Sequence, residues 1–194
     1  NTKLLSGTDL SNSIYSQLQH RINNLKDNSI VPSLAVILVG NNPASKVYVK
    51  NKTKRFEELG LISSTFAFSD QVSEAELVNK IHELNSDVSV HGILVQLPLP
   101  NTINAERILS IISDQKDVDG FHPYTIGRLM QRIPLLRPCT AIGVITMLEA
   151  IEIDPKGMNA VIVGASNLVG RPLNLELLLK GATTTVCHKF TKNL

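Results

Sequence analysis

The chain of 194 residues contains no tryptophan, and aromatic residues make up only 4% of it. Aliphatic side chains must therefore fill its core, and a hydrophobic content of 43% is enough to build one. An aliphatic core is typical of parallel α/β sheets, whose strands are buried on both faces. A chain of this length can form one large domain or two modest ones.

Other shortages argue against several classes of partner. The net charge of +2 is too small to favour nucleic acid, and the apolar runs are far shorter than the ~18 residues that a membrane span needs. Cys139 and Cys187 form no CxxC pair and suggest no disulfide framework, so we expect reduced thiols and a cytoplasmic protein. The five histidines are scattered without ligand spacing, so we expect no metal.

Helical and strand-like patterns alternate along the first two thirds of the chain. Helical patterns cover residues 9–26, 44–59, 73–85 and 104–112, and apolar runs predict strands at 33–39, 65–68 and within 91–100. Ser73 and Glu76 form a capping box for the third helix, and residues 113–124 have the composition of an irregular polar loop. This alternation predicts a mostly parallel α/β domain, which we place at residues 1–139.

The last part of the chain predicts the beginning of a second domain at residues 140–194. Pro134 and Pro138 mark a break, after which Thr140 can cap a linker helix running to about Ile153. A strand at 160–163, a glycine turn, a helix and a strand at 182–187 then form one β-α-β unit. A doubly wound dinucleotide domain normally has about six strands, so this Rossmann-like domain is a partial one.

Gln96 is a polar residue in the apolar segment from Gly92 to Leu97. Burying a side-chain amide without partners costs about 1–3 kcal/mol, so we expect this amide to be hydrogen-bonded. Ligands of open α/β sheets bind at the carboxyl ends of the strands, where Gln96 is expected to lie.

The turn from Gly164 to Gly170 connects a predicted strand to a predicted helix. Its spacing is G-x-S-x-x-x-G rather than G-x-G-x-x-G, so it predicts either a pyrophosphate site on backbone N–H groups or simply a tight turn. The next strand ends in Cys187-His188-Lys189, where NAD sites usually carry a carboxylate. A cation there favours the 2′-phosphate of NADP, although Lys189 is equally compatible with an ordinary surface lysine.

Two further pairs of residues are candidates for a functional site. Tyr48 and Lys52 are four residues apart and share one face of a helix. If that face meets the carboxyl edge of the sheet, Lys52 can act in proton transfer; otherwise it belongs to a solvated basic helix. Asp117 and Asp119 suit a turn, acid–base work or a metal, and an aspartate can also accept two hydrogen bonds from an amino-heterocycle.

Taken in order, these segments resemble the bifunctional methylenetetrahydrofolate dehydrogenase/methenyltetrahydrofolate cyclohydrolase family. The matching segments are residues 39–45 with Tyr48 and Lys52, then 92–100, 116–121, 138–140, 163–172 and 188–194. Each segment is weakly diagnostic alone, but the ordered set spans nearly the whole chain and is highly specific.

The resemblance implies a role for each candidate residue. Lys52 would be the catalytic lysine and Gln96 would orient it, while Tyr48 would stack on the folate and Asp119 would anchor the pterin. Leu97 and Pro98 would complete the substrate site. The cofactor site would comprise Gly164, Ala165, Ser166, Arg171, His188 and Lys189. Many members carry arginine at the position of Ala165, so Arg171 or Lys189 would replace it at the 2′-phosphate.

The implied activity is NADP-dependent oxidation of 5,10-methylenetetrahydrofolate to the methenyl cation, followed by hydrolysis to 10-formyltetrahydrofolate in one cleft. The resemblance also implies a homodimer that acts in one-carbon metabolism and purine biosynthesis. The alternative is a folate-binding or cyclohydrolase-only form that lacks dehydrogenase activity because its nucleotide domain is incomplete. A two-domain NADP oxidoreductase of the shikimate or amino-acid dehydrogenase kind is a third interpretation, but it does not explain Gln96.

Overall fold

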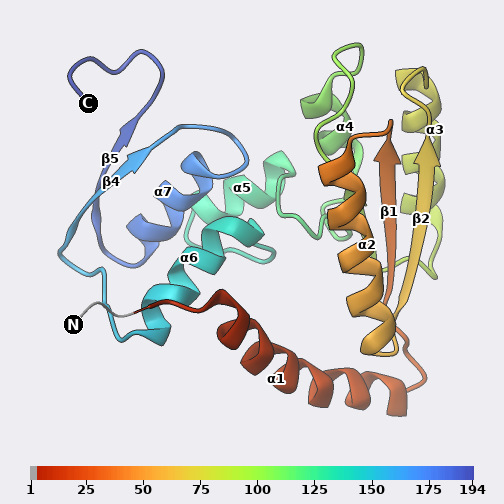
Figure 1. The fold of residues 1–194 in the computed structure, drawn as a ribbon, viewed down its shortest axis with the longest axis horizontal. Coiled ribbons are helices and arrows are strands. Elements are labelled where there is room, and N and C mark those ends of the chain that lie inside the picture. Colours follow the sequence, from red (N-terminus) through yellow and green to blue (C-terminus); the bar gives the residue numbers. More distant parts are fainter. Residues whose placement is uncertain (1–3) are drawn as a thin grey trace. The chain divides into compact units, whose positions relative to one another are not determined.

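The computed structural model describes residues 4–194, which divide into two compact units (Figure 1). The first unit is residues 16–118, and the second is residues 119–194 together with residues 4–15. The helices are α1 (Gly7–Asp27), α2 (Pro43–Glu58), α3 (Glu74–Ser86), α4 (Ala105–Ile111), α5 (Pro123–Met130), α6 (Cys139–Ala150) and α7 (Gly170–Leu179). The strands are β1 (Ser33–Val39), β2 (Ile62–Phe68), β3 (Gly92–Val95), β4 (Asn159–Val163) and β5 (Thr183–Cys187).

The first unit is built on a parallel three-stranded sheet in the order β2-β1-β3. The central strand β1 is buried from Leu34 to Val39, and the four residues of β3 are buried as well. Val36 and Leu94 pack with Val49 of α2 in one aliphatic cluster. The predicted parallel α/β fold is therefore confirmed, with the aliphatic core that the scarcity of aromatics requires.

The order of the strands determines where a ligand site can form. The connection from β1 to β2 and the connection from β2 to β3 cross the sheet in opposite directions. Because both crossovers are right-handed, α2 covers one face of the sheet and α3 covers the other (Figure 1). Helix α4, which follows β3, packs on α3. The chains leaving β1 and β3 thus diverge to opposite faces, which makes the carboxyl edge between these strands a topological switch point.

Most predicted elements of the first unit are confirmed, with two corrections. The Ser73 hydroxyl accepts a hydrogen bond from the Glu76 N–H at 3.2 Å and caps α3 as expected. Strand β2 begins at Ile62, three residues before the predicted start. It is an edge strand, so Ser63 and Ser64 pair with β1 without the apolar run that marks a buried strand. Gln96 follows β3 instead of lying within it: its N–H still donates to the Ile37 carbonyl at 2.9 Å, but Pro98 has no N–H to extend the ladder.

Part of the predicted polar loop is tied to the sheet. Asp117, only 1% exposed, forms a parallel bridge with Ile93 of β3, and the Ile93 N–H donates to the Lys116 carbonyl at 2.8 Å. A Cβ atom added to Gly92 would lie 2.4 Å from the Cγ1 methyl of Val118, so the segment packs closely on β3. The same segment leads directly to Asp119.

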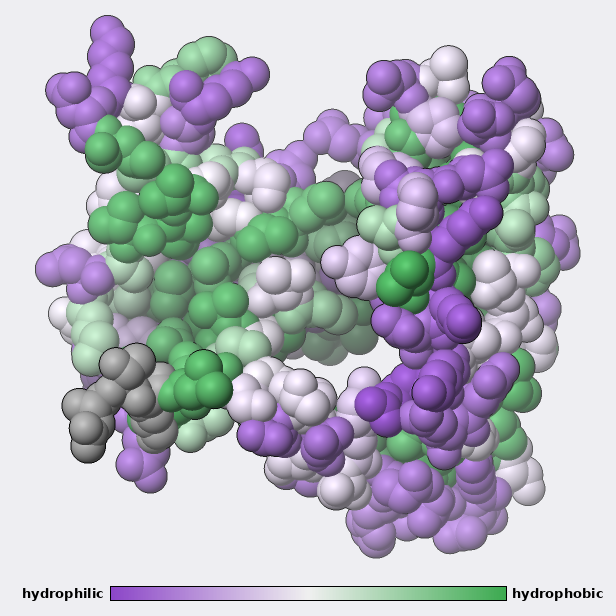
Figure 2. Space-filling model, viewed as in Figure 1, coloured by the Kyte–Doolittle hydropathy of each residue, from purple (hydrophilic) through white to green (hydrophobic). Residues whose placement is uncertain are grey.

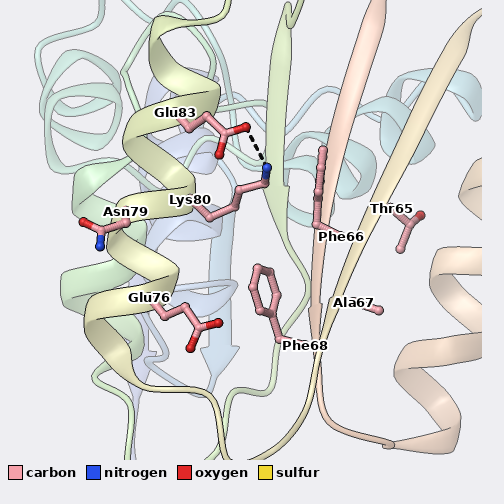
Figure 3. Close-up of a pocket in the computed structure, with 8 residues that line it drawn as sticks. All are labelled: Thr65, Phe66, Ala67, Phe68, Glu76, Asn79, Lys80 and Glu83. Carbon is pink, nitrogen blue, oxygen red and sulfur yellow. Dashed lines mark hydrogen bonds and ion pairs between the residues drawn. The ribbon is translucent and has the colours of Figure 1, made fainter.

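A groove runs between the outer edge of β2 and helix α3 (Figure 3). Lys80 crosses it, with its Nζ 2.8 Å from the Glu83 carboxylate and 4.2 Å from the centroid of the Phe66 ring. Lys80 and Glu83 in the groove are therefore paired with each other. The groove lies on the α3 side of the sheet, opposite the face that α2 covers.

The second unit contains the predicted β-α-β unit. Strands β4 and β5 are parallel, and α6 and α7 pack on them through a core that includes Ile145, Ile162 and Leu177. Val161 and Val163 of β4 remain 66% and 71% exposed. Figure 2 shows hydrophobic residues gathered on the surface of the second unit.

Two features of the second unit differ from the predictions. Pro138, not Thr140, is the N-cap of α6, because the helix already begins at Cys139; Thr140 lies inside its first turn. Helix α5 begins in the segment predicted to be a loop, where the His122 Nδ1 accepts from the Tyr124 N–H at 3.1 Å and Pro123 occupies the first turn. Among residues 4–194, no helix is both long and apolar enough to cross a membrane.

Candidate active site

Helix α2 carries Lys52 on the side that faces the sheet. The helix begins directly after β1, where the Asn42 side chain accepts from the Ser45 N–H at 3.1 Å and Pro43 occupies the first turn. Ser45 and Val49 are buried, and Lys52 continues the same stripe at helical spacing and is half-buried. Because helical side chains tilt toward the helix N-terminus, Lys52 extends toward the carboxyl edge of the sheet.

Lys52 meets Gln96 at that edge. The lysine Nζ lies 3.4 Å from the Gln96 Oε1, a distance at the long end of the hydrogen-bonding range. The other end of the amide is also bound, because Gln96 Nε2 donates to the Leu97 carbonyl at 2.8 Å. This second bond turns the amide oxygen toward the lysine. The contact expected between Lys52 and Gln96 is therefore present.

The arrangement holds an ammonium group against a neutral acceptor. A neutral amide can orient a lysine without the strong preference for its protonated form that a carboxylate would impose. Both residues are half-buried, so a ligand at this edge could reach the lysine. The geometry thus suits a lysine that exchanges a proton with a bound substrate.

The other predicted substrate residues of the first unit lie close by in the chain. Tyr48 is 61% exposed and one helical turn before Lys52, and Leu97 and Pro98 directly follow Gln96. Sequence reasoning missed Ser45, which is 2% exposed and donates from its hydroxyl to the Leu97 carbonyl at 3.4 Å. Ser45 lies seven residues before Lys52, which is two helical turns on the same face. This spacing is the signal in the sequence that could have revealed it.

Asp119 belongs to the second unit and is half-buried. The next residue, Gly120, has a φ of +74°, and a Cβ atom there would lie 2.8 Å from the Arg137 carbonyl carbon and from the Pro138 nitrogen. A side chain at position 120 is therefore excluded by both conformation and space. The loop that carries Asp119 is held closely against the backbone of residues 137–138.

The glycine turn has the features of a phosphate-binding loop. A Cβ atom on Gly170 would lie 1.9 Å from the Gly164 carbonyl oxygen, so only glycine allows α7 to approach the end of β4 this closely. Gly164 has a φ of +127° and open space where a side chain would stand. The Ser166 hydroxyl accepts from the Val169 N–H at 3.1 Å and steadies the turn. An open backbone before a helix N-terminus is suited to a pyrophosphate.

Basic side chains lie near the turn and after β5. The Arg171 Nε donates to the Ala165 carbonyl at 3.0 Å, so its guanidinium lies over the turn. After β5, the His188 Nδ1 accepts from the Phe190 N–H at 3.2 Å, and the Lys189 Nζ lies 4.9 Å from the centroid of the Phe190 ring. The chemistry of these groups fits a dinucleotide that carries an additional 2′-phosphate.

Two models of known protein domains match this chain. Residues 5–119 match the catalytic domain of tetrahydrofolate dehydrogenase/cyclohydrolase, and residues 138–194 match the NAD(P)-binding domain of the same family. The first match alone covers more than half of the chain.

Solved structures of similar proteins match nearly the whole chain. A bifunctional FolD methylenetetrahydrofolate dehydrogenase/cyclohydrolase from Campylobacter jejuni is 49% identical, with a TM-score of 0.95 over 98% of this chain and 68% of its own. A 5,10-methylenetetrahydrofolate dehydrogenase from the silkworm Bombyx mori is 37% identical, with a TM-score of 0.94 over 100% of this chain and 70% of its own.

A third similar structure, from Trypanosoma brucei, is a methylenetetrahydrofolate dehydrogenase-cyclohydrolase complexed with NADP and an inhibitor. It is 29% identical, with a TM-score of 0.93 over 98% of this chain and 65% of its own. The two domain matches and the similar structures confirm the resemblance drawn from the ordered motifs. The chain belongs to the tetrahydrofolate dehydrogenase/cyclohydrolase family.

Proposed function

We propose that this protein oxidises 5,10-methylenetetrahydrofolate to 5,10-methenyltetrahydrofolate with NADP and hydrolyses the product to 10-formyltetrahydrofolate. Its family membership supports both activities. The observation that carries the proposal is the contact between Lys52 and Gln96 at the switch point of the first sheet, because it provides an oriented proton carrier where substrates of such folds bind.

Lys52 is the proposed proton carrier of the hydrolytic step. The methenyl group is already a cation, so water can add to it without an electrophilic metal. Both protons of that water must then leave its oxygen: one is delivered to the ring nitrogen as the ring opens, and the other is released to solvent. Lys52 can serve both transfers, with Gln96 holding its nitrogen in place. Tyr48 would stack on the folate, Asp119 would accept hydrogen bonds from the pterin, and Leu97 and Pro98 would line the site.

The proposed cofactor residues hold NADP in the second unit. When bound, NADP supplies the acceptor for the hydride that leaves the methylene carbon. The open backbone of Gly164 to Ser166 would receive the pyrophosphate, and the histidine, lysine and arginine near β5 and α7 (His188, Lys189 and Arg171) would surround the adenosine phosphate. The absence of a carboxylate after β5 supports NADP over NAD.

We propose folate-binding and NADP-binding domains at residues 1–139 and 140–194, and a cytoplasmic homodimer that supplies 10-formyltetrahydrofolate to purine synthesis. The family resemblance supports these assignments, and the exposed apolar face of β4 offers a surface that a partner subunit can cover. Sedimentation of the purified protein tests this proposal: a homodimer should have twice the mass of one chain.

Two spectrophotometric assays test the enzymatic proposal. Purified protein should reduce NADP in the presence of methylenetetrahydrofolate and should hydrolyse methenyltetrahydrofolate without any cofactor. Hydrolysis without NADP reduction would instead indicate the cyclohydrolase-only alternative, and the absence of both activities would contradict the proposal.

The NADP assignment has its own test. Lys189→Ala should raise KM for NADP, whereas Lys192→Ala, the matched change three residues later, should leave it unchanged. Equal KM values for NADP in the two variants would remove Lys189 from the cofactor site.

A further inference from the structure

The second unit contains a buried carboxylate that the proposed chemistry does not use. Glu176 lies in the middle of α7 and is 0% exposed. Arg137, from the segment before α6, pairs with it in a two-pronged arrangement: the arginine Nε donates to Oε1 at 2.8 Å, and Nη2 donates to Oε2. The arginine side chain is itself only 28% exposed.

Stability alone does not explain this buried ion pair. Removing two charges from water opposes folding, and replacing a buried ion pair with apolar residues of similar volume is often neutral or stabilising. Leucines already occupy α7 at positions 173, 175, 177, 178 and 179, so an apolar contact would suit the helix. What leucine cannot provide is directional geometry, because the two parallel hydrogen bonds of an arginine–carboxylate pair fix distance and orientation together.

The two partners of the pair each adjoin a part of the proposed site. The backbone of Arg137 and Pro138 is the surface against which Gly120 packs, with no space for a Cβ atom, and Gly120 follows the proposed pterin anchor Asp119. Glu176 lies on the helix that begins at Gly170, where contact with the Gly164 carbonyl closes the proposed nucleotide turn.

Within the second unit, the pair therefore connects the loop of Asp119 to the helix of the nucleotide turn. Both connections are closely packed, because the loop has no free space at Gly120 and the helix has none at Gly170. A displacement of Arg137 relative to Glu176 would change the position of one site relative to the other.

We propose that the Arg137–Glu176 ion pair is a positioning device that sets the pterin anchor relative to the nucleotide turn and thereby aligns the two reactants for hydride transfer. The inference rests on the proposed function. Hydride transfer requires the reacting carbons of the folate and of NADP to be correctly placed relative to each other. A misplacement of about 1 Å can reduce a rate about a hundredfold. Hydrolysis uses the folate, its pterin anchor and Lys52 but no cofactor, so the position of the nucleotide turn relative to Asp119 has no part in that step.

The experiment compares the two activities of the same preparation. Glu176→Gln keeps the shape of the side chain but removes its charge, which can reduce stability. The double variant Arg137→Met/Glu176→Leu removes the directional link while filling the space with apolar groups, and its thermal midpoint should not fall. Lys180→Met/Glu149→Leu is the matched control, because it removes an ion pair between α7 and α6 on the surface of the same unit.

We expect the Arg137/Glu176 double variant to lose at least about tenfold in dehydrogenase kcat at saturating NADP and folate, while its cyclohydrolase kcat stays within about twofold of wild type. The control should retain both activities. An unchanged ratio of dehydrogenase to cyclohydrolase activity in a folded double variant would overturn the inference. Unfolding of both the Glu176→Gln variant and the double variant would also overturn it, because the pair would then be a stabilising contact only. A wild-type protein without NADP reduction would overturn the proposed dehydrogenase and this inference with it.

Discussion

Replacing Gln96 by methionine tests whether its amide orients Lys52. Methionine has a similar volume but no strong acceptor for the lysine Nζ. Hydrogen bonds to charged groups contribute about 1.5–3 kcal/mol, and the 3.4 Å separation lies beyond the usual 2.7–3.2 Å, so we take the lower end of that range. A loss of about 1.5 kcal/mol in the transition state corresponds to about a tenfold lower cyclohydrolase kcat, since 1.36 kcal/mol is a factor of ten.

The stability of the variant should change little. Gln96 is half-buried, and the Leu97 carbonyl, which loses the amide donor, keeps the Ser45 hydroxyl at 3.4 Å. Hydrolysis of methenyltetrahydrofolate and thermal unfolding are measured on the same samples, with the exposed Gln71→Met as the matched control. A Gln96→Met variant with wild-type kcat would refute the orienting role. A fall in activity matched by a comparable loss of folded protein would also refute it.

Gln96→Glu makes a second test of the same contact. A carboxylate at this position would favour the protonated form of Lys52, so the pH–rate profile of hydrolysis should move to higher pH. An unchanged profile would mean that Gln96 and Lys52 do not interact during the reaction.

Two further predictions concern the first unit. The Ser89 hydroxyl, and then its N–H, hydrogen-bond Asp87 and lower the pKa of its carboxyl below 3.8. The stabilisation is therefore present above that pH and lost as the pH falls through the folded-state pKa. Ser89→Ala should lower the free energy of unfolding at neutral pH, and the difference from wild type should disappear in strong acid, as urea titrations at several pH values can measure. Gly92→Ala should lower the free energy of unfolding, because the new Cβ atom would lie 2.4 Å from a Val118 methyl. Adding Val118→Ala to the same chain should restore part of that stability. A double variant no more stable than Gly92→Ala would contradict this packing.

The features that were predicted correctly depend on local pattern. Strand β1 is a continuous apolar run, and α3 has its cap and its periodicity within a few residues, so both are visible in the sequence. The contact between Lys52 and Gln96 was expected because both residues were assigned to the carboxyl edge of one sheet and resemble known motifs.

The features that were missed depend on partners that are distant in sequence or on competing local signals. Arg137 and Glu176 are separated by 39 positions, and no local pattern indicates that they pair. Strand β2 is an edge strand, and Ser63 and Ser64 near its start lack the apolar signal of a buried strand. Thr140 has the chemistry of an N-cap, but Pro138 is the N-cap and the helix already begins at Cys139.

The central claim is that Lys52 carries the proton in hydrolysis. The most direct measurement compares Lys52→Met with Lys50→Met, an identical change at an exposed position on the same helix. Folate binding and methenyltetrahydrofolate hydrolysis are measured for both variants. We predict that Lys52→Met binds the folate but no longer hydrolyses it, while Lys50→Met does both. Normal hydrolysis by Lys52→Met would contradict the assignment of the catalytic lysine.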